Sequence, residues 1–199
     1  MVRIAVLVSG GGTNLQALID AQSRGELKNG RIAAVLSSRP DAYALERAAR
    51  AGIPGYVVAR KDFASNREMT IALVDKLREL NIGLVVLAGF LHILTGEMVA
   101  AFPNAILNVH PALIPSFCGK GMYGLRVHEA ALEKGVKVTG ATVHLVNEIP
   151  DGGRILLQKA VEVLPGDTPE VLQRRVMEQA EWVLLPQAAE LVARGLSTD

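Results

Sequence analysis

Residues 4–15, IAVLVSGGGTNL, decide the fold that the sequence predicts. The first five are apolar, which is typical of a strand that is buried on both faces. Three consecutive glycines follow and favour a tight turn, because residues without a Cβ adopt backbone angles that others avoid. Leu15, Leu18 and Ile19 then share one face of a helix. This order of strand, glycine loop and helix predicts the start of a parallel α/β sheet.

The alternation of apolar runs and helix-period segments continues well past the middle of the chain. Further strands are expected at residues 32–36, 56–58, 84–88 and 105–109, with helices between them. None of these runs alternates between polar and apolar residues, which indicates that helices cover both faces of the sheet. Ser65 and Glu68 have the spacing of a capping box at the start of the third helix.

After residue 137 the pattern changes. Thr142 and His144 alternate with apolar neighbours, and a similar pattern recurs around Lys159 and Glu162. Alternation predicts an antiparallel hairpin at one side of the sheet, joined by the loop 147–153.

The C-terminal segment predicts a long final helix. Thr168 is a favourable N-cap, and Pro169 suits the first helical position. Pro186 is expected to kink or split this helix, because proline lacks the N–H that the helical ladder uses. We therefore predict a single α/β domain over residues 1–199. Its sheet is doubly wound, mostly parallel and Rossmann-like, with an antiparallel hairpin on one side and a long C-terminal helix.

The composition argues against several classes of protein. The chain has 199 residues and a net charge of +1, from 21 basic and 20 acidic side chains, so it lacks the basic excess of nucleic-acid-binding proteins. The longest nearly apolar stretch, 82–94, is too short to span a bilayer. The single cysteine, Cys118, cannot form an internal disulfide, which suits a reducing compartment. We expect a cytoplasmic protein with no membrane or nucleic-acid partner.

The glycine loop after the first strand is a candidate phosphate site, because converging N–H groups and a helix N-terminus stabilise an anion. A nicotinamide dinucleotide site would need glycine in place of Leu15 and an acid in place of Ser37 or Ser38. A nucleoside triphosphate loop would need Gly-Lys-Ser/Thr, and Gly119-Lys120-Gly121 follows no predicted strand. Two interpretations of the glycine loop are left, a site for one phosphate group and a turn without a ligand.

The second candidate is Asn108-Val109-His110-Pro111, at the carboxyl end of the fifth strand, where open α/β sheets bind ligands. Asn108 and His110 share a face of the strand. An amide donor beside a protonatable imidazole suits an acyl transfer that passes through an oxyanion. Asp151, in the hairpin loop, would favour the imidazolium if the loop folds back over this strand. The alternatives are a histidine bonded to backbone, an asparagine that caps a turn and an ordinary Asp-Gly-Gly turn.

The other histidines, His92, His128 and His144, form no helical pair of metal ligands. With one cysteine in the chain, no dedicated zinc site is expected, although His110 and His144 could converge from adjacent strands. His144 is equally consistent with a structural role and a site role. His128 is expected on the surface of a helix.

Two longer motifs point to a family. The run NVHPALIP at 108–115, followed at a distance by Asp151-Gly152-Gly153, resembles the signature of the folate-dependent formyltransferases. The opening run VSGGGTNLQ at 8–16 resembles one branch of them, the phosphoribosylglycinamide formyltransferases of purine synthesis. Matching segments extend from about residue 2 to about residue 195, so the resemblance covers nearly the whole chain.

The resemblance implies transfer of a formyl group from 10-formyltetrahydrofolate to the amine of phosphoribosylglycinamide, giving formylglycinamide ribonucleotide and tetrahydrofolate, or else to another small amine. It assigns catalysis to Asn108, His110 and Asp151, with His110 as the proton donor and no metal. It assigns the substrate phosphate to Gly12, Thr13 and Asn14. The residues that it assigns to the folate are Arg67, Leu91, His92, Ile93, Leu94, Asn108, Asn147 and Asp151.

The chain departs from the family pattern at three places. His92 stands where some members have arginine, and residues 116–126 form a longer stretch than in one subgroup. The family places a ribose-contacting glutamate five residues after an arginine of the last helix, whereas Glu181 lies six residues after Arg175, so Glu181 receives no role. The bond between Ile114 and Pro115 can be cis in the family.

Four alternatives are disfavoured. A methionyl-tRNA formyltransferase would add a basic C-terminal domain, and a formyltetrahydrofolate hydrolase an N-terminal regulatory domain; neither is expected here. Leu15 argues against a nucleotide-dependent oxidoreductase. A non-catalytic sensor of a phosphorylated metabolite would have no reason to combine Asn108, His110 and Asp151. We expect an enzyme with small-molecule substrates that is a monomer or a homodimer.

Overall fold

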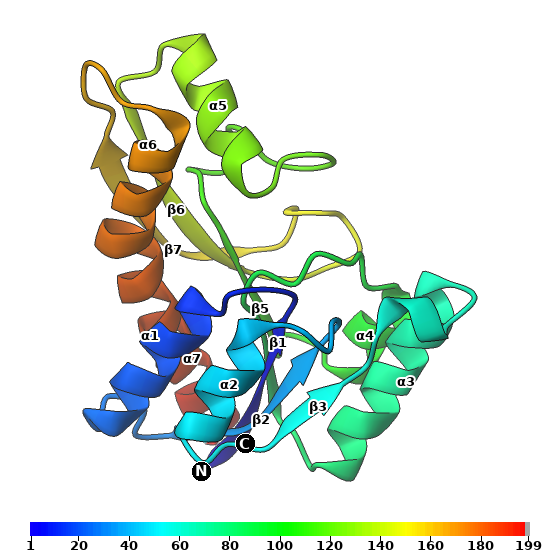
Figure 1. The fold of residues 1–199 in the computed structure, drawn as a ribbon. Coiled ribbons are helices and arrows are strands. Elements are labelled where there is room, and N and C mark those ends of the chain that lie inside the picture. Colours follow the sequence, from blue (N-terminus) through cyan, green and yellow to red (C-terminus); the bar gives the residue numbers. More distant parts are fainter. Residues whose placement is uncertain (198–199) are drawn as a thin grey trace.

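The computed structural model describes residues 1–197 and shows one seven-stranded sheet between two sets of helices (Figure 1). The strands are β1 (Val2–Val8), β2 (Gly30–Ser37), β3 (Gly55–Val57), β4 (Leu84–Leu87), β5 (Ile106–His110), β6 (Val138–Leu145) and β7 (Ile155–Glu162). The helices are α1 (Thr13–Ser23), α2 (Tyr43–Arg50), α3 (Asn66–Glu79), α4 (Gly96–Ala101), α5 (Leu125–Lys134), α6 (Pro169–Val176) and α7 (Trp182–Leu196). A 3-10 turn lies at Arg60–Asp62 and a π-helical turn at Met177–Glu181.

The strand order is β3-β2-β1-β4-β5-β6-β7. The pairs among β1 to β5 are parallel, whereas β6 pairs antiparallel with both β5 and β7. The predicted doubly wound sheet with a hairpin on one side is therefore confirmed. Among residues 1–197 no helix combines the length and the apolar character that a membrane span needs.

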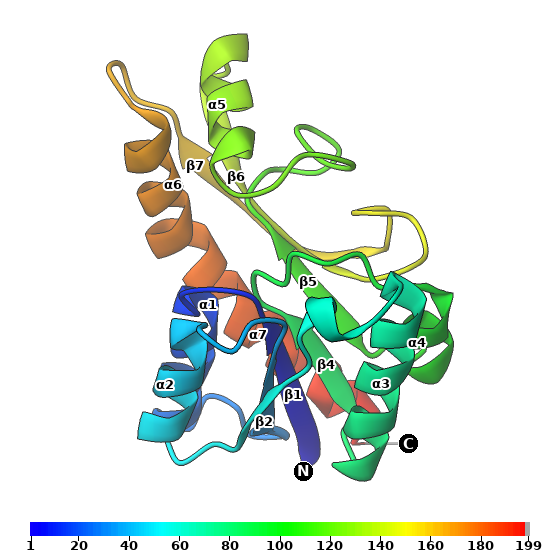
Figure 2. The same ribbon diagram turned by 45° about the vertical axis from the view of Figure 1, so that its right-hand side comes forward.

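Each face of the sheet has its own hydrophobic core. On one face, residues of α1, α2 and α7 pack with Ile4, Val6 and Val8 of β1. On the other face, residues of α3 and α4 pack with Ala5 and Leu7. Figure 2 shows these two groups of helices on opposite sides of the central strands. Successive residues of β1 thus point into different cores, which explains why its sequence does not alternate.

Two predicted helix starts are confirmed. The Ser65 hydroxyl accepts the N–H of Glu68 at 3.1 Å, and the Glu68 carboxylate accepts the N–H of Ala64 rather than that of Ser65. The Thr168 hydroxyl accepts the N–H of Val171 at 3.4 Å, and Pro169 occupies the first turn of α6. Both caps satisfy N–H groups that have no partner inside the helix.

The sequence predicts a kink or a split of the final helix at Pro186, and the split does not occur. The helix changes character earlier, in the π-helical turn Met177–Glu181, and α7 then runs through Pro186. Proline removes one hydrogen bond of the helix. Here the missing bond lies within one turn of the π-helical turn, where the hydrogen-bond pattern already changes. The helix therefore continues.

The carboxyl ends of the parallel strands come together at one edge of the sheet. The Ser9 hydroxyl, at the end of β1, lies 2.7 Å from the Ser38 hydroxyl after β2 and accepts the N–H of Leu91 after β4 at 3.0 Å. These bonds connect the loops that follow three strands. They hold the glycine loop and the segment after β4 against each other.

Candidate active site

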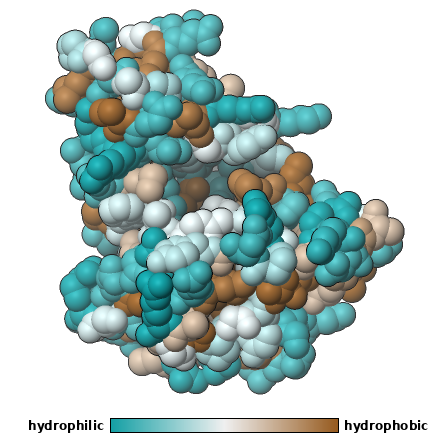
Figure 3. Space-filling model, viewed as in Figure 1, coloured by the Kyte–Doolittle hydropathy of each residue, from teal (hydrophilic) through white to brown (hydrophobic). Residues whose placement is uncertain are grey.

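A cavity of about 430 Å³ opens at the carboxyl ends of β1, β4 and β5, where open α/β sheets bind their ligands. Its walls come from Thr13 and Asn14 after the glycine loop, residues 89–93, the end of β5, residues 119–124, His128 of α5, the hairpin loop, α6 and the π-helical turn. Figure 3 shows the hollow between the part of the molecule that carries α5 and the part that carries α1 to α3.

The three predicted catalytic residues meet in this cavity. Asn108 and His110 lie at the end of β5, and His110 is only 4% exposed. Asp151 comes from the loop between β6 and β7, which folds back over β5, as the sequence allowed. Its φ of 55° lies in the left-handed region, which is unfavourable for a side chain with a Cβ. Aspartate tolerates this conformation in turns better than most residues do, so the angle also fits the ordinary Asp-Gly-Gly turn.

The Asp151 carboxylate is the centre of a polar network. Its Oδ2 accepts the N–H of Gly119 at 2.9 Å and lies 3.6 Å from His110 Nδ1. Its Oδ1 lies 3.4 Å from Asn108 Nδ2 and 3.5 Å from His144 Nε2. Burial raises the pKa of Asp151, but the bonds from His144 and Gly119 and the charges of both histidines outweigh it and lower the pKa below its ordinary value. Asp151 is therefore a carboxylate throughout the neutral range.

The backbone fixes which nitrogen of His110 exchanges a proton. Nε2 lies 2.8 Å from the carbonyl oxygen of Phe117. A carbonyl only accepts hydrogen bonds, so Nε2 carries a proton whatever the charge of the ring. The nitrogen that faces Asp151 is Nδ1. A proton passed to a substrate would therefore leave from Nδ1.

His144, for which the sequence left two roles open, lies in the network. In the antiparallel pairing of β5 with β6 it is directly opposite Asn108. Its Nδ1 donates to the Leu145 carbonyl at 2.8 Å. In the neutral ring Nε2 accepts from Asn108 Nδ2 at 3.2 Å, whereas in the protonated ring Nε2 donates toward Asp151 Oδ1 at 3.5 Å. The second N–H of the Asn108 amide points to Asp151 over a long 3.4 Å. An oxyanion could replace that weaker acceptor without breaking the bond to His144.

His110 and His144 do converge, as the sequence allowed, but on a carboxylate. Residues 1–197 contain no group of three or more His, Cys, Asp or Glu side chains arranged to hold a metal ion.

The glycine loop places two of its three predicted phosphate contacts in the cavity wall, namely Thr13 and Asn14. Gly12 lies behind them and precedes α1 with a φ of 71°. Only glycine fits there, because a Cβ would lie 2.6 Å from the Cβ of Ala44.

Glu181 also lines the cavity, although the sequence assigned it no role. The π-helical turn just before α7 absorbs one extra residue, so Glu181 turns toward the glycine loop and its Oε2 accepts the Asn14 Nδ2–H at 2.7 Å. Burial raises the pKa of Glu181 to about 6, against the opposing hydrogen bond from Asn14. Asn14 Oδ1 is buried and has no partner within residues 1–197.

The predicted folate contacts are divided between the cavity and its surroundings. Leu91, His92 and Ile93 line the cavity, and Leu91 and Ile93 are 62% and 61% exposed. Burial, with a smaller effect of the Arg60 charge, lowers the pKa of His92.

Three of the predicted contacts lie outside the cavity wall. Arg67 pairs with Glu97, Leu94 packs against a core cluster, and Asn147 donates to the Gly152 carbonyl at 3.1 Å.

The prediction that His128 lies on a helix surface is wrong. Together with Val127 and Ala131 it forms the inner face of α5, where it is fully buried beside the cavity. Neither ring nitrogen has a hydrogen-bond partner within residues 1–197. Burial, and to a lesser extent the charge of His110, lowers the pKa of His128 to about 4. The apolar spacing of Val127 and Ala131 was the signal that marked this face.

The stretch before α5 forms part of the rim of the cavity. Gly119, Gly121 and Gly124 all have positive φ there, and all three line the cavity. The bond between Ile114 and Pro115, at the start of this stretch, is cis, as the resemblance allowed.

Comparison with known proteins agrees with the fold and the motifs. The model of the Formyl transferase family matches residues 2–188. Phosphoribosylglycinamide formyltransferase of Haemophilus influenzae is 43% identical over 98% of this chain and 89% of its own length. The human trifunctional purine biosynthetic protein adenosine-3 is 45% identical over 97% of this chain, which spans only 18% of that longer protein.

Solved structures show the same relationship. Glycinamide ribonucleotide transformylase 1 from Symbiobacterium toebii superposes with a TM-score of 0.92 at 46% identity, covering 98% of this chain and 89% of that one. Phosphoribosylglycinamide formyltransferase from Brucella melitensis has a TM-score of 0.87 at 41% identity, covering 96% and 95%. The match of fold, motifs and nearly the full length of the chain shows that this protein belongs to the formyltransferase family.

Proposed function

We propose that the protein transfers the formyl group of 10-formyltetrahydrofolate to the amine of phosphoribosylglycinamide, a step of purine biosynthesis. One observation carries this proposal. A single cavity holds the network of Asn108, His110 and Asp151 together with a glycine loop at a helix N-terminus. The first suits acyl transfer and the second suits a phosphate, so together they fit an amine that bears a phosphate group. The printed names of the relatives support the same substrate.

The cavity residues suit the folate co-substrate. Leu91 and Ile93 expose apolar side chains at the edge of the cavity, where a flat aromatic ring system can pack. His92 lies between them and is a further contact of the proposal. Contacts from Arg67, Leu94 and Asn147 stay predictions, because these residues lie outside the cavity wall.

Each catalytic residue has a separate part in the reaction. The co-substrate supplies a formyl carbon that an amine can attack. Asn108, through its N–H toward Asp151, and His110, through Nδ1–H, stabilise the negative charge that develops on the formyl oxygen. Asp151 lies beside His110 Nδ1 and compensates the charge of the ring when it is protonated. His110 gives its Nδ1 proton to the folate nitrogen as the bond from that nitrogen to the formyl carbon breaks, and the proton that the attacking amine loses on forming its own bond to that carbon returns to Nδ1. Thr13 and Asn14 bind the phosphate with backbone N–H groups.

The ribose has an acceptor in the same wall. The Glu181 carboxylate lines the cavity beside Asn14. A hydroxyl group of a ribose would donate to it. The sugar would then lie between the phosphate site and the catalytic network.

The proposal extends to the setting of the enzyme. It acts on small molecules, in the cytoplasm, as one domain over residues 1–199, without nucleic-acid partners and as a monomer or a homodimer. The net charge of +1 supports the absence of a nucleic-acid partner. Light scattering during size-exclusion chromatography would measure the oligomeric state.

The experiment is a turnover assay with the purified protein, 10-formyltetrahydrofolate and phosphoribosylglycinamide, followed by the change in folate absorbance. We expect formyl consumption that depends on the ribonucleotide. Consumption without it would contradict the proposal, as would no consumption at all. Turnover with a different small amine, and none with the ribonucleotide, would favour another formyltransferase.

A further inference from the structure

The glycine loop is held from behind by helix α2. The Gly10 carbonyl accepts the N–H of Ala44 at 3.1 Å, and the Gly11 carbonyl accepts the Nε–H of Arg47 at 2.8 Å. In a trans peptide the carbonyl and the next N–H point in opposite directions. The N–H groups of Gly11 and Gly12 therefore point away from α2.

The N–H groups that follow are also free of the helix. The first hydrogen bond of α1 runs from Gln16 N–H to the Gly12 carbonyl at 2.9 Å. The N–H groups of Thr13 and Asn14 thus lie outside the helical ladder, and both residues line the cavity. The orientation of the Gly11–Gly12 peptide decides whether the N–H of Gly12 points the same way as those of Thr13 and Asn14.

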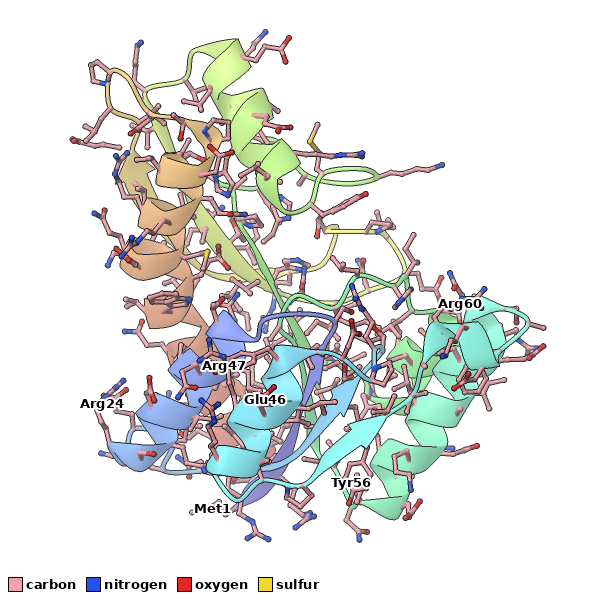
Figure 4. All side chains as sticks on the ribbon, viewed as in Figure 1. Met1, Arg24, Glu46, Arg47, Tyr56 and Arg60 are labelled. Carbon is pink, nitrogen blue, oxygen red and sulfur yellow. The ribbon has the colours of Figure 1, made fainter. Side chains whose placement is uncertain are left out.

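Arg47 is itself fixed on two further sides. Its Nη1 donates to the Gln16 side chain on α1 at 3.0 Å, and its guanidinium lies 5.0 Å from the centre of the Tyr43 ring. Figure 4 shows Arg47 in the space between α1 and α2. It forms no ion pair within residues 1–197, whereas Arg50, one turn later, pairs with Glu46 at 3.3 Å. An arginine with only a structural role on such a helix would ordinarily pair with a carboxylate of the same helix, as Arg50 does.

We propose that Arg47 is a positioning residue for the phosphate site. Its bond to the Gly11 carbonyl turns the following N–H toward the phosphate of the substrate, and its bond to Gln16 locks the loop onto α1. Arg47 acts from behind the loop, on the side away from the network of Asp151. It therefore affects binding of the phosphorylated amine and not of the folate. The inference rests on the proposed function for the identity of that amine.

The test compares Arg47→Met with the matched control Arg50→Met, since both arginines lie on α2 against Tyr43. For Arg47→Met we expect the KM for the ribonucleotide to rise about tenfold, which corresponds to about 1.4 kcal/mol. The KM for the folate and kcat at saturation should stay within twofold of the original. Arg50→Met should leave all three unchanged. Arg47→Lys, which keeps one donor and the charge, should recover part of the rise.

A second readout does not depend on turnover. Calorimetry with inorganic phosphate should give a weaker Kd for Arg47→Met than for Arg50→Met. If the original protein binds phosphate in this way but does not formylate the ribonucleotide, the proposed function fails and the role of Arg47 stands. Equal phosphate affinities in the two variants would overturn the role of Arg47, even in an active enzyme. A fall in kcat that accompanies the rise in KM would overturn it as well, because it would show general damage to the site.

Discussion

Replacement of Asp151 by asparagine would remove the charge at the centre of the network and keep the shape of the side chain. The carboxylate lies 3.6 Å from His110 Nδ1, and the two side chains are only 13% and 5% exposed. With an effective dielectric constant near 20, the attraction between carboxylate and imidazolium at this distance is about 4 to 5 kcal/mol. The amide oxygen of asparagine can still accept the N–H of Gly119, so the loop should keep its path.

This energy sets the size of the expected effect. The attraction acts on the positive charge that His110 carries as proton donor, so its loss raises the barrier to proton transfer, and the other partners of the site reduce the effect. We expect kcat at pH 7 to fall between about a hundredfold and a thousandfold, within the range of general acid catalysis. The KM for the ribonucleotide should change little, because the phosphate site lies at another part of the cavity.

The assay is kcat as a function of pH for the original protein, Asp151→Asn and the control Asp41→Asn. Asp41 is an exposed carboxylate that pairs with Arg39 away from the cavity. Because the pKa of Asp151 lies below its ordinary value, the original enzyme should keep this carboxylate charged until the pH falls below about 4. Circular dichroism would check folding. If folded Asp151→Asn kept more than a third of kcat at pH 7, the charge argument would be wrong.

Three further predictions concern stability and the loop. Because burial raises the pKa of Glu181 to about 6, the folded state binds its proton more tightly than the unfolded state does. The contribution of Glu181 to the free energy of unfolding therefore falls by about 2 kcal/mol as the pH rises from 4.5 to 6. Glu181→Gln should lack that fall in urea unfolding at pH 4.5 and 7, and an unchanged difference would contradict the assignment. The pH dependence that His128 causes has the opposite sign. Its pKa of about 4 means that the unfolded state binds the proton more tightly, so the free energy of unfolding should rise by about 3 kcal/mol between pH 4 and 6.5. His128→Leu should not show this rise, and a variant with the same slope as the original would refute the burial argument. Gly12→Ala should weaken ribonucleotide binding at least tenfold, because the new Cβ would lie 2.6 Å from Ala44 Cβ at a φ of 71°; an unaltered KM would show that the loop accommodates it.

The features that the sequence predicted well are local. The glycine loop follows β1, and Asn108 and His110 lie two residues apart, so their side chains share a face in any sheet that contains this strand. The approach of Asp151 required a long-range contact, and the resemblance to a family made it predictable. Residue spacing alone left it as one possibility among ordinary turns.

The features that the sequence left open or mispredicted depend on register and packing. His144 joins the network because β6 pairs with β5 in one particular register, which the alternation of β6 does not specify. His128 turns inward because the apolar face of α5 includes it, although a histidine favours the surface on average. The π-helical turn that brings Glu181 to the cavity depends on how α6 and α7 dock, and no residue in it marks a change of helix type.

Two of the bonds that organise the catalytic centre come from the main chain of one surface loop. The carbonyl of Phe117 holds His110, and the N–H of Gly119 holds Asp151. Neither bond is lost when a side chain in the loop is shortened, so alanine scanning would not detect these two contacts. Proline at 119 would remove the N–H, and it cannot adopt the φ of 89° found there. These two contacts therefore restrict the backbone path of the loop rather than its side chains, and changes of its length should disturb both contacts.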